Sequence, residues 1–304
     1  MASLFRKVRP DTVIHTASMI DCRPHPSPLL DAVNVDGTAT LIQLCQEHGA
    51  RRLVYTSSIE VMYGAAGADN ACEDACESLP YPAKSTQGYQ RTKIAAEKLV
   101  LAAHSPGGLQ SCVLRPGHIY GPGDDLFFLA KVGSCFGRAG FGSQGVRMSM
   151  VHVENMAHAH LLAARRLLAS GAKAAAVGGK AINIGDFDEN IVATYHEMAG
   201  APPPSITLPF ALLKLIVSLG VLMSHLAWYL FGVRLGHPKT TVASEAALSA
   251  GLPATMSSVQ QRELLGYTPP LSRERARAQC AAWFEATGGG RHVFAQKQRP
   301  LIEG

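Results

Sequence analysis

Tyr89 and Lys93, within "YQRTK", are the two residues whose types and spacing most clearly suggest chemistry. They lie four positions apart in a segment with helical periodicity, so both side chains should project from one face of a helix. An ammonium near a phenol favours the phenolate and lowers the tyrosine pKa from its ordinary value of about 10. Such a pair can move a proton to or from a carbonyl or alcohol oxygen. The spacing alone is a weak indication, because it also occurs on solvated helix faces.

Two apolar segments end in residues that could complete this site. Ser57 and Ser58 close the segment "RLVYTSS", and Pro116 and Gly117 follow "SCVLR". In open α/β sheets, ligands bind at the carboxyl ends of the parallel strands. A serine hydroxyl there can hold a substrate oxygen while the tyrosine moves the proton. A Pro–Gly turn can bring backbone against a flat cofactor ring. The alternative is that the serines only end the strand and cap a turn.

The elements that must position these residues alternate between strands and helices. Alternation at this spacing predicts an α/β fold with a parallel sheet covered by helices on both faces. The expected strands are Thr12–Ala17, Arg52–Ser58 and Ser111–Pro116, and the expected helices are Leu29–His48 and Gln87–His104. The segment Met62–Thr86 is rich in Gly, Ala, Asp and Pro and is predicted to be a long, functional loop.

Beyond Gly121 the alternation loosens, which suggests a second lobe. A strand running into a helix is expected over Met148–Leu168, a short strand over Ala181–Gly185, and amphipathic helices over 257–287. We therefore divide the chain into a dinucleotide-binding domain, residues 1–122, and a smaller, mostly helical substrate lobe, residues 123–304. The later strands near 148–153 and 181–185 are expected to rejoin the first domain.

Composition excludes several classes of protein. Of the 304 residues, 47% are hydrophobic and only 17% are charged, which argues against disorder. The net charge of +5 is spread without basic blocks, which argues against nucleic acid as a partner. Seven scattered cysteines suit reduced thiols in a reducing compartment. Neither Cys72 and Cys76 nor His152, His158 and His160 have metal-site spacing, so no metal is expected.

The segment Leu208–Val233 is apolar on all sides. A membrane span needs about 20 predominantly apolar residues. Three interpretations stay open: a spanning helix, an in-plane or re-entrant anchor, and a buried core helix. Lys214, Ser218, Ser224 and His225 weaken the spanning alternative, and Trp228 and Tyr229 could lie at an interface.

Four motifs occur in a fixed order: "NVDGT", "YTSSIEV", "YQRTK" and "LRPGHIYGPGD". Together they resemble the extended short-chain dehydrogenase/reductase superfamily, and "TSSIEV" is similar to its 3β-hydroxysteroid dehydrogenase branch. The later "MVHVENMAHAHLLAA", "GGKAINIGD" and the apolar segment resemble the sterol-4α-carboxylate 3-dehydrogenases of that branch. The resemblance extends over nearly the whole chain.

The resemblance implies roles for particular residues. Tyr89 would be the general acid/base, and Lys93 would lower its pKa and hydrogen-bond the nicotinamide ribose. Ser58 would orient the substrate oxygen, with Ser57 as the fallback. Asn34 would complete a proton relay through water, although a packing role in its helix is nearly as well supported. The residues expected to line the cofactor are Ala17, Ser57, Tyr89, Lys93, Pro116, Gly117, His118 and Ile119.

The implied function is NAD(P)-dependent oxidation of a 3β-hydroxyl on a sterol or steroid, with decarboxylation where the substrate carries a 4α-carboxylate. NAD is the expected cofactor, with NADP left open. The expected partners are a hydrophobic sterol-like substrate and a membrane, and a homodimer is left open. The chain is expected to face a reducing compartment, at the endoplasmic reticulum or at a cytoplasmic membrane face. The alternatives are a nucleotide-sugar epimerase or other carbonyl reductase of the superfamily, and an inactive membrane-associated fragment.

One family feature is missing from this sequence. Relatives begin with a strand, a GxxGxxG turn and a helix, whose backbone and N-terminus hold the pyrophosphate. Only eleven residues precede Thr12, and none of them forms this turn. We therefore expect a partial Rossmann-type sheet that lacks its first strands and exposes the face and edge of "TVIHTA". The same loss predicts weak or no binding of NAD(H), and hence impaired activity.

Overall fold

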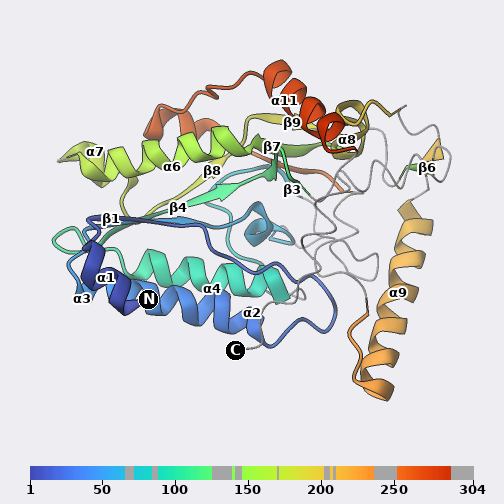
Figure 1. The fold of residues 1–304 in the computed structure, drawn as a ribbon, viewed down its shortest axis with the longest axis horizontal. Coiled ribbons are helices and arrows are strands. Elements are labelled where there is room, and N and C mark those ends of the chain that lie inside the picture. The colour runs from blue at the N-terminus through green and yellow to red at the C-terminus, as the bar shows by residue number, and fades with distance from the viewer. Residues whose placement is uncertain are drawn as a thin grey trace.

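The computed structural model describes residues 1–65, 72–83, 88–124, 139–140, 146–169, 171–201, 206–207, 210–235 and 252–288. It is an α/β fold built around a four-stranded parallel sheet with helices on both faces (Figure 1). The strand order is β1-β2-β4-β8. These strands are Thr12–His15, Arg52–Thr56, Gln110–Pro116 and Ala181–Ile184, respectively. The parallel sheet and all four of these strands were predicted from the sequence.

Side chains of β2 alternate between the two helical layers. Leu53 and Tyr55 pack into one core with helices α3 (Gly37–Glu47) and α4 (Gly88–Ala102). Val54 packs into the opposite core with α6 (Val153–Leu168). A strand buried on both faces is hydrophobic at nearly every position, as in "LVY". The short helix α7 (Ala172–Val177) lies beside α6 on the same face (Figure 1).

The predicted helix Leu29–His48 is present but contains an irregular turn. It begins as α2 (Leu29–Asp31), passes through a π-helical turn over Ala32–Asp36, and continues as α3. Turns of this kind are frequent at functional sites. This one places Asn34 in a buried position facing α4.

A second sheet corrects two expectations. Its strands are β3 (Cys72–Ala75), β11 (Ala254–Met256), β7 (Met148–His152) and β5 (His118–Tyr120), with β9 (Phe187–Glu189) antiparallel to β7. The predicted loop Met62–Thr86 therefore contains a strand. The strand near 148–153 joins this second sheet, and only the strand near 181–185 rejoins the first. Strands β6 (Ala139–Gly140) and β10 (Ile206–Thr207) form a separate pair.

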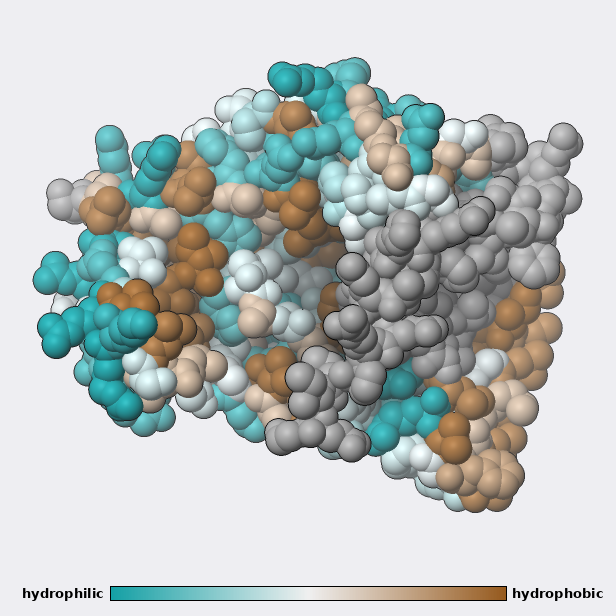
Figure 2. Space-filling model, viewed as in Figure 1, coloured by the Kyte–Doolittle hydropathy of each residue, from teal (hydrophilic) through white to brown (hydrophobic). Residues whose placement is uncertain are grey.

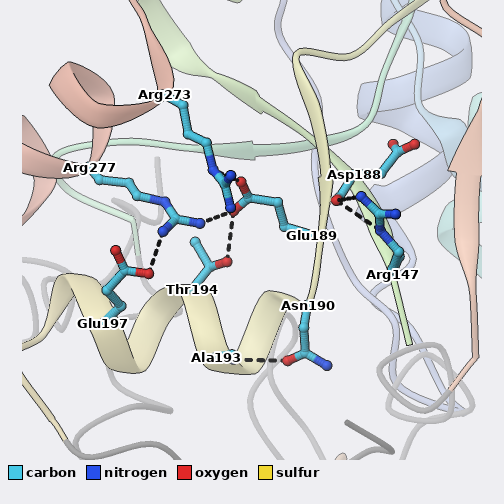
Figure 3. Close-up of polar contacts among 9 residues, drawn as sticks. All are labelled: Arg147, Asp188, Glu189, Asn190, Ala193, Thr194, Glu197, Arg273 and Arg277. Carbon is cyan, nitrogen blue, oxygen red and sulfur yellow. Dashed lines mark hydrogen bonds and ion pairs between the residues drawn. The ribbon is translucent and has the colours of Figure 1, made fainter. Parts of the chain in front are cut away.

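The C-terminal helix α11 (Arg273–Ala286) is tied to α8 (Ile191–Met198) by a cluster of charges (Figure 3). Arg273 and Arg277 both pair with Glu189, and Arg277 also pairs with Glu197. Thr194 donates a further hydrogen bond of 2.9 Å to Glu189. Each carboxylate is thus matched by a guanidinium, and apolar residues of α11 also pack against α8. A π-helical turn over Gln261–Leu265 precedes α11.

The predicted apolar helix is α9 (Phe210–Phe231), which stands at one end of the molecule (Figure 1). It is long and apolar enough to cross a membrane, and only 11% of Lys214–Phe231 is buried. In Figure 2 it forms a brown, hydrophobic column at the lower right. Its last turns contact the loop after β1: the Nε2 atom of His25 lies 2.8 Å from Nδ1 of His225, and the His25 ring stacks on Trp228.

Strand β1 has one neighbour, β2, within the described part of the chain. Ile14 in this strand is 39% exposed, as expected for a strand with an uncovered face. A helix that was not predicted, α1 (Ala2–Val8), lies before it. Phe5 anchors α1 in the core beneath α3, and the left-handed conformation of Arg9 ends it.

Candidate active site

The carboxyl end of β2 and the first turns of α4 bring together the predicted serine and tyrosine. After Thr56 the chain turns, and Ser58 begins a 3₁₀ turn over Ile59–Met62 by accepting a hydrogen bond of 3.2 Å from the Glu60 amide. The Ser58 hydroxyl also lies beside the phenol of Tyr89, where it acts to lower the Tyr89 pKa against the larger, raising effect of burial. A substrate oxygen that met this pair would be held by the hydroxyl beside a phenolic proton.

Lys93 lies one helical turn after Tyr89 and is almost fully buried. Its Nζ atom donates to the carbonyl of Thr56 at 2.7 Å and to the hydroxyl of Tyr55 at 3.3 Å. It lies 5.9 Å from the centre of the Tyr89 ring. Burial lowers the pKa of Lys93 to about 8, and the carboxylates of Glu97 and Glu60 oppose that shift. The ammonium is therefore fixed at the strand end behind the phenol.

One expectation about Tyr89 is wrong for this structure. The spacing predicted that Lys93 would lower its pKa. Instead the pKa of Tyr89 lies well above its usual value, because burial and the nearby Glu60 carboxylate outweigh the hydrogen bond from Ser58. Tyr89 therefore carries its proton, and it can accept another only if its own proton leaves at the same time.

Ser57 points away from Ser58, into a buried ion pair. Its hydroxyl donates to Glu97, which also pairs with Arg115 at 2.5 Å and accepts from Tyr81 at 2.9 Å. Glu97 and Arg115 are nearly inaccessible to water. This network joins the ends of β2 and β4 to α4. The geometry favours Ser58 over Ser57 as the residue beside Tyr89, and the predicted cofactor contact of Ser57 stays a prediction.

Asn34 is linked to the site by hydrogen bonds to α4 and to the loop after β1. Its Nδ2 atom donates to Thr92 and to the carbonyl of Met19, both at 2.9 Å, and its Oδ1 accepts from the Met19 amide at 2.7 Å. Its backbone carbonyl accepts from Thr38 at 2.6 Å. These contacts agree with the alternative that Asn34 packs its helix against neighbouring elements. A role in a proton relay stays a prediction.

The remaining predicted cofactor residues lie at two strand ends. Ala17 is exposed just after β1. Gly117 follows β4, where an added Cβ would lie 2.2 Å from the carbonyl oxygen of Ser149, so no larger residue fits. His118 and Ile119 continue into β5, and His118 Nε2 lies 2.8 Å from the Tyr195 hydroxyl. Pro116 is buried at the end of β4. Whether these residues contact a cofactor stays a prediction.

Two carboxylates beside the site were not predicted from the sequence. Glu97 lies four residues after Lys93, so the helical period that paired Tyr89 with Lys93 could have revealed it. Glu60 lies two residues after Ser58, in the 3₁₀ turn. Its Oε2 atom is buried and has no hydrogen-bond partner among the described residues. A turn this short has no periodicity from which the direction of the Glu60 side chain could be predicted.

A parallel sheet of Rossmann type, with serine, tyrosine and lysine gathered at its carboxyl edge, defines the class of short-chain dehydrogenases/reductases. Comparison with known families identifies the family within this class. Residues 8–198 match the 3-beta hydroxysteroid dehydrogenase/isomerase family. The chain belongs to that family, as its motifs predicted.

Curated relatives agree with this assignment. The chain is 34% identical over 270 residues to 3beta-hydroxysteroid-dehydrogenase/decarboxylase isoform 1 of Arabidopsis thaliana, covering 85% of this chain and 58% of that protein. It is 30% identical to short-chain dehydrogenase/reductase family 42E member 1 of Danio rerio, covering 90% and 71%. The chain thus spans little more than half the length of the Arabidopsis relative.

Solved structures share the fold at lower identity. The protein gox2253 has a TM-score of 0.66 at 22% identity, covering 95% of this chain and 83% of that one. The dTDP-glucose 4,6-dehydratase DesIV of Streptomyces venezuelae, solved with NAD and TYD bound, has a TM-score of 0.64 at 19% identity, covering 96% and 80%. At this identity the likeness describes the fold alone.

Proposed function

We propose that the chain carries the catalytic part of an NAD-dependent dehydrogenase that oxidises a 3β-hydroxyl on a sterol or steroid. The observation that carries the proposal is the placement of Ser58 beside Tyr89, with Lys93 buried one helical turn away. Relatives named 3β-hydroxysteroid dehydrogenases support the substrate class. A substrate with a 4α-carboxylate would become a β-keto acid on oxidation, which can lose carbon dioxide.

The residues present fit a nicotinamide cofactor at this sheet edge. An ammonium has three N–H bonds. Lys93 uses two of them, to Thr56 and Tyr55, which leaves one for a ribose hydroxyl. Gly117 has no side chain because the Ser149 backbone occupies the position of a Cβ, so its contact with the cofactor stays a prediction. NAD bound here would supply the hydride acceptor. The NAD complexes among proteins of this fold support the choice of cofactor.

The residues of the chain would handle the proton and the orientation. Ser58 would hold the carbinol oxygen, because the Glu60 amide fixes its hydroxyl beside Tyr89. Tyr89 would take the hydroxyl proton as the carbon–hydrogen bond breaks. Lys93 would hold its positive charge behind the reacting oxygen and stabilise the negative charge that develops there.

Steady-state oxidation of 3β-hydroxysterols at saturating NAD, followed through NADH absorbance, tests the proposal. We expect the Tyr89→Phe variant to lose at least 100-fold in kcat while retaining its fold, because general acid–base catalysis typically contributes about 10²–10⁴-fold. The control is Tyr229→Phe, which makes the same change at an exposed position on α9 and should leave kcat unchanged. Equal rates for both variants, or turnover of UDP-sugars in place of sterols, would refute the proposal.

We further propose that α9 attaches the chain to a membrane. One stripe of the helix is buried at two positions, Val217 and Ser224. The opposite side exposes apolar side chains along its whole length: Leu212, Leu215, Leu219, Leu222, Met223, Leu226 and Leu230. A helix of 22 residues is about 33 Å long, close to the hydrocarbon thickness of a bilayer. The low burial of α9 disfavours the core-helix alternative, and the buried stripe favours an in-plane anchor over a span.

A further inference from the structure

His160 is a buried titratable residue that the scheme above does not use. It lies on α6, which covers the face of the sheet opposite to α4 (Figure 1), and it is only 6% exposed. Its ring has two hydrogen-bond partners. The Nε2 atom lies 2.7 Å from Oγ1 of Thr56, and the Nδ1 atom lies 2.8 Å from the carbonyl oxygen of Met156. Because Thr56 is the last residue of β2, a histidine from the far side of the sheet contacts the strand end that carries the candidate active site.

These two hydrogen bonds determine the protonation state of the His160 ring. A carbonyl oxygen can only accept, so Nδ1 carries the proton that it donates to Met156. In a neutral imidazole the other nitrogen is then an acceptor, and the Thr56 hydroxyl donates to Nε2. A protonated ring would remove that acceptor, because both of its nitrogens would be donors. Burial also lowers the pKa of His160, which agrees with a neutral ring.

Thr56 is held from both faces of the sheet. Its hydroxyl bonds His160 on the α6 side, and its carbonyl oxygen accepts from Lys93 of α4 at 2.7 Å. The register of β1 with β2 ends at His15 and Tyr55, so β2 extends one residue beyond its neighbour. On the other side of this strand end, the Ser57 amide donates to β4 at 2.7 Å. The bond to His160 therefore supports a stretch of β2 that β1 does not support.

We propose that His160 is a positioning residue of the dehydrogenase: through Thr56 it holds the carbonyl that receives the Lys93 ammonium. This inference rests on the proposed function. The Nζ atom of Lys93 lies 5.9 Å from the centre of the Tyr89 ring, and the effect of its charge there weakens as the separation grows. A strand end released from His160 would let this ammonium move away from the phenol. His160 acts through Thr56 and Lys93, so it is not itself a catalytic residue.

A double-mutant cycle on kcat tests whether the two side chains act as one unit. Thr56→Val keeps the shape and the carbonyl of Thr56 but removes its hydroxyl, and His160→Asn removes the Nε2 acceptor. We expect each variant to lose about five- to tenfold in kcat, the equivalent of one hydrogen bond, with KM changed by less than about twofold. The double variant should lose no more than either single variant, because both break the same bond. Losses that multiply would overturn the proposal.

The pH profile of kcat separates positioning from a general loss of folded protein. The acid limb for alcohol oxidation reports the proton loss that lets Tyr89 accept the carbinol proton. The Lys93 ammonium favours the ionised phenol, so an ammonium farther away should shift this limb to higher pH. We expect a shift of about 0.5–1 pH unit in both Thr56→Val and His160→Asn. Loss of folded protein would lower kcat at every pH without moving the limb, and an unmoved limb would contradict the proposal.

A conservative variant and a matched control complete the kinetic test. His160→Gln places an amide oxygen where it can accept from Thr56, so it should recover most of the lost kcat and the wild-type limb. The control is His158→Asn, since His158 lies on the same helix, is half-buried and packs against Tyr267 instead. It should leave both kcat and the limb unchanged. No recovery in His160→Gln would count against the hydrogen bond to Thr56 as the cause.

Nitrogen-15 NMR of the full chain tests the same contacts without any turnover. With labelled histidine, the His160 ring, assigned by His160→Gln, should be the neutral Nδ1–H tautomer at about pH 6.5, where an ordinary histidine is half protonated. With labelled lysine, the Lys93 ammonium signal, assigned by Lys93→Arg, should shift equally in Thr56→Val and His160→Asn. A ring with its proton on Nε2, or an ammonium signal that neither variant moves, would overturn the proposal.

The outcomes separate this inference from the proposed function. An active wild type with unaltered Thr56→Val and His160→Asn variants defeats only the role of His160. A wild type that never oxidises sterols defeats the proposed function, and the NMR signals still decide whether His160 positions Lys93. If His160→Asn fails to fold, Thr56→Val removes the same hydrogen bond and supplies the pH profile and the lysine spectrum.

Discussion

Replacing Glu97 by glutamine should strongly destabilise the fold. The Glu97 side chain is fully buried and pairs with Arg115, whose side chain is only 5% exposed. Glutamine has nearly the same shape but no charge, so the Arg115 guanidinium would stay buried without a counter-ion. Removing one partner of a buried pair costs about 3–5 kcal/mol. That is a large part of the roughly 5–15 kcal/mol by which a domain is stable.

Urea denaturation followed by circular dichroism measures this loss. With a slope of about 2 kcal/mol per molar urea, the midpoint should fall by roughly 2 M. Glu47→Gln is the control, because Glu47 is exposed on α3 and should change stability by less than about 0.5 kcal/mol. The double variant Glu97→Gln/Arg115→Met should recover part of the loss. A loss below about 1 kcal/mol in Glu97→Gln would refute the reasoning.

Two further predictions concern the strand end and α9. Gly117→Ala should lower the free energy of unfolding by about 1–3 kcal/mol, since its Cβ meets the Ser149 backbone. Gly107→Ala, in open space, should not lower it, and equal stabilities of the two variants would contradict this. Leu222→Asp should abolish flotation with phosphatidylcholine vesicles, because an aspartate placed in the apolar part of a bilayer costs about 3 kcal/mol. The control variant Leu168→Asp, changed at an exposed position on α6, should still float with the vesicles. Flotation of both variants would count against the anchor.

Much of the fold could be predicted because its elements are long and periodic. The strands of the first sheet are apolar runs, and α4 and α6 follow the helical period. The second sheet was harder, because β5 and β11 have only three residues each. Segments so short carry no clear alternation, and their partners lie far away in the sequence.

The candidate site, like the fold, could be predicted only in part from the sequence. Ser58 and Tyr89 could be paired because one ends a strand and the other begins a helix beside it. The contacts of Lys93 could not be predicted, because its main acceptor is the backbone carbonyl of Thr56, and a residue of any type at that position would supply this carbonyl. The high pKa of Tyr89 depends on burial and on the direction of the Glu60 side chain, neither of which the spacing of residues contains.

The bond from Lys93 to the Thr56 carbonyl has a consequence for how the site meets its ligands. It locks the ammonium to the tip of β2, and the Ser57–Glu97–Arg115 contacts lock that tip to β4 and α4. Strand tip, amine and phenol therefore form one rigid block before any ligand arrives. Such preorganisation spares the reaction the cost of assembling its polar groups, so that binding has only to deliver the carbinol.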